Sequence, residues 1–353
     1  MVNFIKTDTL KQKPTDESKL GFGRIFTDYM FTMRYSPEEG WHDAVVEPYH
    51  AFEMDPAAMV LHYGQTIFEG LKCYRREDGG LQLFRPRDNF ARMNISAERL
   101  SIPQFDADLA LEGLLKLLDV ERDWVPHQKD TSLYIRPFII ATDPYVGVRA
   151  SNSYIFCIIL SPVGAYYAHG LSPVGIYVED NYVRAVRGGF GFAKTAGNYA
   201  ASLKAGEEAK KKGFDQVLWL DGVDRKYVEE VGSMNMMFVV DGVLKTPALN
   251  GSILAGITRD SILKLAEKDG IKTSEERIAI ADIFAAADEG KLDEAFGTGT
   301  AAVVSPVGEL CWEGRKITVS SGEIGPITAK MYNQLTDIQW GRAEDPFGWI
   351  MKL

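Results

Sequence analysis

Residues 192–213 read FAKTAGNYAASLKAGEEAKKKG, and the first lysine of this segment differs from the others. Lys194 follows a glycine-rich, nearly uncharged run, GGFGFA, whereas the later lysines lie on a charged helical pattern. An ordinary lysine covers apolar surface with its stem and keeps its ammonium in water. A lysine held away from water can instead act as a carbonyl nucleophile or a proton carrier. The segment alone fits both roles.

Length and composition indicate a soluble globular protein of two domains. The chain has 353 residues, of which 46% are hydrophobic and 25% are charged. The net charge of −10 argues against nucleic acid and against acidic membrane surfaces, because both are polyanions. An anionic substrate stays possible, since local basic residues can attract it.

The first 20 residues, MVNFIKTDTLKQKPTDESKL, lack the apolar core of a signal peptide and predict a polar, frayed leader. The longest apolar stretch, YIFCIIL at 154–160, is too short to span a bilayer and predicts a buried strand. An odd number of widely spaced cysteines argues against a disulfide framework or a zinc site and favours the cytoplasm. These are Cys73, Cys157 and Cys311. No metal site is expected, because the histidines also lack metal-binding spacing: His42, His50, His62, His127 and His169.

The first half of the chain predicts strands with two helices. Predicted strands lie at 59–64, in two runs within 67–84 around a turn at 77–80, at 132–142 and at 153–161. Predicted helices lie at 87–100, after Pro86, and at 106–122. The turn-rich residues 162–173 then predict a domain boundary. We expect a smaller N-terminal domain at 1–168, a linker at 169–174 and a larger domain at 175–353 that carries Lys194.

The second half mixes strands and helices without regular alternation, which favours an α+β fold. A helix is predicted at 198–212, with Asn198 as its N-cap and Gly213 just beyond its end. Asp241 and Gly242 predict a hairpin turn, and a second helix is predicted from Gly256. Predicted strand regions lie at 175–180, 216–222, 227–240 and 243–245.

The commonest use of a buried reactive lysine is a Schiff base with pyridoxal 5′-phosphate (PLP) or with a carbonyl substrate. PLP also needs an anion site for its phosphate, and two stretches could supply one. The helix that starts after Gly256 presents the amides of Ile257 and Thr258, and FGTGTAA at 296–302 offers a turn with exposed amides. Arg92 could add a charged fork.

The same FGTGTAA stretch matches the G-x-G-x-x-A pattern of nicotinamide enzymes. The following VVSPVGEL reads as a strand, however, and that fingerprint requires a helix. A PLP ring also needs a carboxylate at its nitrogen. Adjacent carboxylates on a strand point to opposite faces, so one of Glu229 and Glu230 is expected to face the interior, and we choose Glu230. Tyr199 is placed to reach the same ring.

With these residues assembled, nearly the whole chain resembles the branched-chain amino-acid aminotransferases, which are PLP enzymes of fold type IV, the D-amino-acid-aminotransferase-like class. The resemblance rests on ten stretches in the family's order: GFGRIFTDYM, LHYGQTIFEGLKCY, LFRPRDNFARM, SLYIRPFI, PVGAYY, KTAGNYAASL, QVLWLDG, EEVGSMNMMF, LAGITRD and FGTGTAAVVSPVG. It implies a homodimer, while the cysteines favour the cytoplasm and the net charge argues against membrane and nucleic-acid partners. It also implies reversible, ping-pong amino transfer from leucine, isoleucine or valine to 2-oxoglutarate.

The resemblance further implies a role for each candidate residue. Lys194 would bind PLP and carry the chemistry, Tyr199 would contact the ring phenolate oxygen, and Glu230 the ring nitrogen. The phosphate would be held by Arg92, Ile257, Thr258 and Thr300. The substrate pocket would comprise Phe22, Tyr63, Phe68, Tyr134, Arg136, Tyr166, Thr300 and Ala301, with Arg136 receiving the side-chain carboxylate of glutamate.

One departure from animal relatives concerns regulation. Those relatives carry a redox-sensing C-x-x-C pair where this chain has Ala302 and Ser305, so thiol regulation of that kind is not expected and a bacterial type is favoured. Alternatives are a D-amino-acid aminotransferase or an aminodeoxychorismate lyase of the same fold, a catalytically idle PLP carrier, and a nicotinamide dehydrogenase. The stretches YIRPF, PVGAYY and FGTGTAA favour the branched-chain group.

Overall fold

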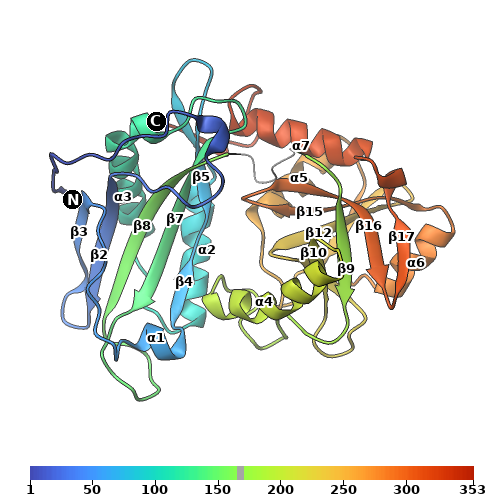
Figure 1. The fold of residues 1–353 in the computed structure, drawn as a ribbon, viewed down its shortest axis with the longest axis horizontal. Coiled ribbons are helices and arrows are strands. Elements are labelled where there is room, and N and C mark those ends of the chain that lie inside the picture. Colours follow the sequence, from blue (N-terminus) through green and yellow to red (C-terminus); the bar gives the residue numbers. More distant parts are fainter. Residues whose placement is uncertain (165–170) are drawn as a thin grey trace. The chain divides into compact units, whose positions relative to one another are not determined.

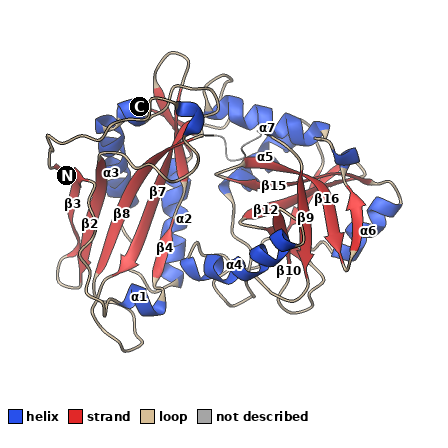
Figure 2. Cartoon of the chain, in the orientation of Figure 1, coloured by secondary structure: helices blue, strands red, loops and turns tan. Residues whose placement is uncertain are grey.

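The structure is a computed structural model that describes residues 1–164 and 171–353. Its internal contacts divide the chain into two compact units. The first comprises Met1–Ala168, Ala193–Ala196 and Ile338–Leu353, and the second comprises His169–Phe192 and Gly197–Asp337. Both units mix helices with strands, as Figure 2 shows, in agreement with the predicted α+β class.

A large sheet forms the frame of the first unit (Figure 1). Its strands among the described residues are β1 (Asn3–Phe4), β2 (Tyr29–Ser36), β3 (Gly40–Pro48), β4 (Thr66–Phe68), β5 (Leu71–Arg75), β6 (Leu81–Phe84), β7 (Ser132–Ala141), β8 (Tyr154–Val163) and β18 (Ile350–Lys352). Their order is β1-β3-β2-β8-β7-β5-β6-β18, and β4 also pairs with β7. Apart from the parallel pair β1–β3, neighbouring strands run antiparallel.

Two helices cover one face of this sheet: α2 (Pro86–Arg99) and α3 (Ala107–Val120). Their buried side chains share one apolar core with alternate residues of the strands, among them Leu133 and Ile135 of β7. Because side chains alternate along a strand, Tyr134 and Arg136 point to the opposite face. The helix predicted from Asp106 is confirmed, and the Asp106 side chain accepts hydrogen bonds from the first amides of α3.

The strand predicted at 59–64 is wrong, because Met59–Tyr63 form a short helix, α1. The helix ends at Gly64, which has a left-handed backbone (φ 60°) and donates its amide to the carbonyl of Val60. An alternation of apolar residues this short does not separate a strand from one helical turn. The decisive signal was the glycine, which suits the end of a helix.

The N-terminal segment was predicted to be frayed, and this expectation is wrong. Val2 is buried, its amide donates to Glu112 (3.1 Å), and Lys116 donates to its carbonyl (2.6 Å). Further along, the amide of Lys11 donates to Asp28 (2.6 Å). The polar composition of the segment therefore reflects partners on the unit's surface.

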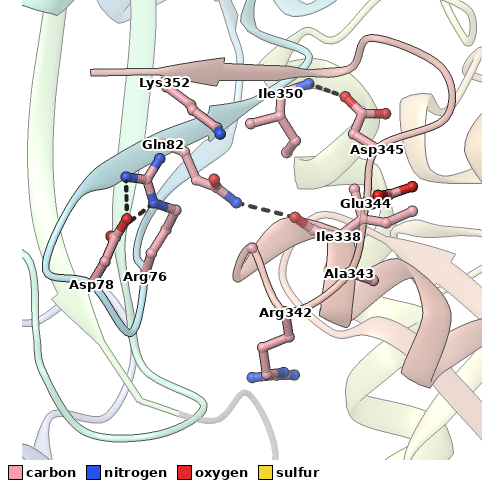
Figure 3. Close-up of a pocket in the computed structure, with 11 residues that line it drawn as sticks. Arg76, Asp78, Gln82, Ile338, Arg342, Ala343, Glu344, Asp345, Ile350 and Lys352 are labelled. Carbon is pink, nitrogen blue, oxygen red and sulfur yellow. Dashed lines mark hydrogen bonds and ion pairs between the residues drawn. The ribbon is translucent and has the colours of Figure 1, made fainter.

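The C-terminal segment returns to the first unit, where β18 pairs antiparallel with β6. A pocket of about 880 Å³ lies beside this edge and is drawn in Figure 3. Some of its lining side chains pair with one another or with backbone: Gln82 donates to the carbonyl of Ile338 (3.0 Å), and Arg76 pairs with Asp78 (2.8 Å). The pocket contains none of the residues predicted for the site.

The sheet of the second unit closes on itself, because β11 pairs with both β10 and β12. Its strands among the described residues are β9 (Val174–Glu179), β10 (Gln216–Leu220), β11 (Val228–Val231), β12 (Met234–Val240), β13 (Val243–Pro247), β14 (Thr273–Glu276), β15 (Leu292–Gly299), β16 (Val303–Trp312) and β17 (Arg315–Thr318). Its helices are α4 (Ala196–Lys211), α5 (Ile257–Lys268), α6 (Ile280–Asp288) and α7 (Pro326–Gln339). Within the described ranges, no helix is both long and apolar enough to cross a membrane.

Several predictions for the second unit are confirmed, and one is corrected. Asp241 and Gly242 form the turn of the β12–β13 hairpin with positive φ angles of 50° and 71°. The predicted helix after Gly256 is α5. Asn198 is not an N-cap, because α4 starts at Ala196 and the Asn198 side chain donates to the carbonyl of Phe190 (3.0 Å).

The contact units differ from the predicted domain boundaries in three segments, the first being the predicted linker at 169–174, because the second unit begins at His169. The other two are Ala193–Ala196 and Ile338–Leu353, which belong with the first unit, whereas both were predicted to lie in the second domain. The pairing of β18 with β6 explains the C-terminal segment. The segment that carries Lys194 joins the first unit because its backbone bonds to β4 and α2.

Candidate active site

The backbone of Lys194 is fixed by two elements of the first unit. The amide of Phe68 donates to its carbonyl (3.0 Å), and the hydroxyl of Thr195 donates to the carbonyl of Thr66 in β4 (2.7 Å). The Lys194 amide donates to the hydroxyl of Ser96 on α2 (2.9 Å). These hydrogen bonds hold the backbone of Lys194 in place.

The side chain of Lys194 is half-buried, so it is neither sealed from water nor fully exposed. Its ammonium lies 4.7 Å from the centroid of the Phe68 ring. This aromatic contact shows one side of the apolar environment that the sequence predicts for this lysine.

A buried carboxylate lies beside this segment, and it was not among the predicted residues. Glu69 is fully buried and accepts from Arg92 at both oxygens (Nε to Oε1 2.7 Å, Nη2 to Oε2 2.9 Å). The side chain of Asn89 adds a bond of 2.9 Å. Burial acts to raise the pKa of Glu69, but Arg92, Lys194 and Asn89 outweigh it, so the pKa lies below its ordinary value. Glu69 is therefore a carboxylate at neutral pH.

Four of the predicted substrate residues contact one another on the face of the sheet opposite the helices. Arg136 donates to the hydroxyl of Tyr134 (3.1 Å), and its guanidinium lies 4.9 Å from the centroid of Phe68. Phe22 packs edge-on against Tyr134, with ring centroids 4.9 Å apart. A side chain at Gly70 would lie 2.1 Å from the Tyr134 hydroxyl, so this glycine leaves room for the ring.

Two other predicted substrate residues do not join this cluster. Tyr63 lies on α1, is exposed, and donates from its hydroxyl to the carbonyl of Val146. Tyr166 lies outside the described residues. Their roles stay predictions.

The predicted ring carboxylate, Glu230, lies on β11 in the second unit and is buried. One of its oxygens accepts from the amide of Leu254 (2.7 Å), and the other lies 3.2 Å from Nε of Arg184. Arg184 is also buried and donates to the carbonyls of Ser252 (2.5 Å) and Gly191 (3.1 Å). The guanidinium stabilises Glu230 as an anion and joins it to two loops.

Only one of the two adjacent glutamates was expected inside, and this is corrected, because both are buried. Their side chains do take opposite faces of β11, but the loop at 250–254 donates to each of them. Glu229 accepts from Asn250 (3.2 Å) and from the hydroxyl of Ser252, and Glu230 accepts from Leu254. Burial by itself therefore does not distinguish the two carboxylates.

Asn235 of β12, also absent from the prediction, connects three parts of the second unit. It lies opposite Glu230 in the β11–β12 pair and opposite Thr298 in the β12–β15 pair. Its side chain donates to the carbonyl of Leu254 (2.9 Å). A side chain at Gly256 would lie 1.9 Å from its amide oxygen. Glu230, the start of α5 and the FGTGT turn thus share one framework.

Both predicted anion sites lie on this framework. Gly256 is the N-cap of α5 and has no side chain with which to cap the helix. The amides of Ile257 and Thr258 belong to the first turn of α5. Thr300 follows β15 in the turn before β16. Tyr199 lies half-buried in the first turn of α4.

Comparison with known proteins identifies the family. The family model "Amino-transferase class IV" matches residues 66–310. The chain is 56% identical to branched-chain-amino-acid transaminase 1 of Bacillus subtilis, with 99% of this chain and 98% of the relative covered. It is 57% identical to a probable branched-chain-amino-acid aminotransferase of Staphylococcus epidermidis, with 100% and 98% covered.

This chain belongs to the class IV aminotransferases. The solved branched-chain aminotransferase of Escherichia coli has a TM-score of 0.76 with it at 30% identity, covering 92% of this chain and 98% of that one. The T.th. branched-chain amino acid aminotransferase, solved with pyridoxamine 5′-phosphate, has a TM-score of 0.75 at 26% identity, covering 92% and 97%. The predicted resemblance to branched-chain aminotransferases is confirmed, and so is the predicted two-domain α+β fold of type IV.

Class IV aminotransferases depend on PLP, which confirms the predicted cofactor of this chain. The residues present fit this group. The second unit contains a buried carboxylate paired with Arg184, Glu230, and a helix that starts at a glycine N-cap, Gly256, and Asn235 contacts both regions. These are the partners that a protonated pyridine ring and a phosphate require. The first unit supplies an amine with a fixed peptide, Lys194.

We expect Gly256→Ala to weaken PLP binding about 10-fold or more. The added methyl group would lie 1.9 Å from the Asn235 amide oxygen, so the amide or the helix start must move. Titration of apoenzyme with PLP measures the effect. Gly206→Ala is the matched control, because a side chain there meets open space on α4. Equal affinities for Gly256→Ala and wild type would contradict the phosphate role of this helix start.

Proposed function

We propose that this aminotransferase moves the amino group of L-leucine, L-isoleucine or L-valine to 2-oxoglutarate and runs reversibly in two half-reactions. One observation carries the proposal: 56% identity over almost the full length of both chains to a branched-chain-amino-acid transaminase of Bacillus subtilis. This agrees with the function predicted from the sequence.

The bound cofactor withdraws electrons from the substrate Cα and stores the amino group between half-reactions. Lys194 supplies the proton transfers. Its amine takes the proton from the substrate Cα and returns a proton on the same side, because one fixed amine serves both positions. The hydrogen bonds of the Lys194 backbone to Phe68 and Ser96 keep that amine within reach of the substrate through both half-reactions.

Glu230 keeps the ring nitrogen protonated, so that the ring can accept electrons. A carboxylate can do this only if it stays ionised, and Arg184 at 3.2 Å favours the ionised form. The Leu254 amide orients the second oxygen. Tyr199 contacts the phenolate oxygen, and the phosphate is held by Arg92, Ile257, Thr258 and Thr300.

The cluster of Phe22, Phe68 and Tyr134 forms an apolar wall for branched side chains. Such a wall accepts leucine, isoleucine and valine together, because one methylene changes binding by only about 1–3 kcal/mol. Glutamate needs a cation at the same place, and Arg136 supplies it. The Thr300-Ala301 turn receives the α-carboxylate. The roles of Tyr63 and Tyr166 in the pocket stay predictions from the sequence.

We expect Arg136→Ala to lower kcat/KM for glutamate at least about 10-fold more than for leucine, because only glutamate loses an ion pair. Steady-state assays with both substrates test this. Arg277→Ala is the matched control, because Arg277 also stacks on a tyrosine ring, Tyr227 at 3.5 Å, but is half exposed. Equal losses for the two substrates would remove Arg136 from the substrate site.

The function is tested by mixing purified protein with leucine and 2-oxoglutarate and measuring glutamate. An absorbance spectrum before and after leucine alone tests the cofactor and the first half-reaction together. A protein that binds PLP but forms no glutamate would be an idle carrier and would refute the proposal.

We further propose that the enzyme is a homodimer of the cytoplasm. The resemblance to branched-chain aminotransferases supports the dimer, and three buried free cysteines support a reducing compartment. Light scattering after gel filtration tests the dimer, and a monomeric mass for active enzyme would exclude it.

A further inference from the structure

Glu69 is a buried carboxylate outside the residues assigned above, placed where the end of β4 meets α2. We propose that it is a positioning residue, which fixes the guanidinium of Arg92 for the cofactor phosphate. The proposal rests on the proposed function, since Arg92 is the phosphate ligand there. It concerns the phosphate end of the site, whereas Glu230 concerns the ring.

The contacts set the orientation of Arg92. A guanidinium carries five N–H donors in one plane, and Glu69 accepts from two of them, at Nε (2.7 Å) and Nη2 (2.9 Å). Such a fork fixes both the position and the plane of the group. Asn89 and the Gly70 amide hold the same carboxylate from its other sides. The fixed plane of the guanidinium therefore also fixes the directions in which the other N–H groups of Arg92 point.

Burial makes this pair a single unit. Glu69 has no exposed surface and Arg92 only 8%. Removing the charge of one partner leaves the other buried and unbalanced, which favours a shift of the arginine toward water. With glutamine at position 69, Arg92 keeps its charge and loses its fixed orientation.

The peptide of Lys194 has supports of its own. It is held by the hydroxyl of Ser96 and the amide of Phe68, and neither group belongs to the Glu69–Arg92 pair. Pyridoxal, which lacks the phosphate, needs Lys194 but not Arg92. The dissociation constant of pyridoxal therefore reports whether the region around Lys194 is intact, independently of Arg92.

The test titrates apoenzyme with PLP and with pyridoxal, for the wild type, Glu69→Gln, Arg92→Gln and the double variant. We expect Glu69→Gln to raise the dissociation constant of PLP about 10-fold or more and that of pyridoxal much less. We expect the double variant to bind PLP no more weakly than Arg92→Gln alone, because Glu69 acts through Arg92.

Asp88→Asn is the control. It removes an ion pair between a half-exposed carboxylate in the first turn of α2 and Arg85, the N-cap of that helix, and should leave both constants unchanged. Equal losses for PLP and pyridoxal in Glu69→Gln, or additive losses in the double variant, would overturn the proposal. Wild-type apoenzyme that bound no PLP would instead refute the proposed function.

Discussion

Lys194→Ala is expected to abolish transamination, with turnover reduced about 10⁴-fold or more. The substitution removes the amine that binds the cofactor and carries the Cα proton. The visible absorbance band of covalently bound cofactor should disappear with it. The backbone hydrogen bonds of residue 194 to Phe68 and Ser96 do not involve its side chain, so the variant should keep the fold.

Lys204→Ala is the matched control for this experiment. Lys204 lies on α4 with an exposed ammonium that pairs with Glu208 (3.1 Å), and its loss should leave turnover and spectrum unchanged. Borohydride reduction of the wild type followed by peptide mapping locates the covalent link. A pyridoxyl label on another residue, or full turnover by Lys194→Ala, would defeat the assignment.

Local sequence patterns predicted several elements whose start, end or turn is set by residues within the element itself. The start of α3 follows from Asp106 and an apolar stripe, and the β12–β13 turn follows from Asp241 and Gly242. Predictions failed for both chain ends, where a distant partner decides the structure. The N-terminal segment looks unstructured until its contacts with β3 and α3 are known. Contacts with the first unit likewise decide where the C-terminal strand belongs.

The candidate site shows the same division. Lys194 and Glu230 stand out in the sequence because a cation and a carboxylate interrupt apolar surroundings. Arg184 and Asn235 were missed because their importance lies in what they contact, and those partners are remote in the chain. Glu69 carried a detectable signal, a carboxylate directly after the apolar strand β4. No local pattern, however, pairs it with Arg92.

Glu230→Gln is expected to keep PLP bound but to lower kcat about 10²-fold or more. A glutamine can still accept from the Leu254 amide, so the loop should stay in place. It cannot balance a protonated ring nitrogen, and the neutral ring accepts electrons poorly. Proton removal from Cα should then limit the rate, so the isotope effect with Cα-deuterated leucine should rise above that of the wild type.

The adjacent Glu229→Gln is a demanding control, because Glu229 is equally buried and has its own donors in the same loop. Both substitutions remove one buried negative charge from neighbouring positions of β11. If charge at the ring nitrogen is the cause, only position 230 lowers kcat and raises the isotope effect. Equal changes at both positions would indicate a general effect of buried charge and would remove Glu230 from the ring site. Unaltered kinetics in Glu230→Gln would do the same.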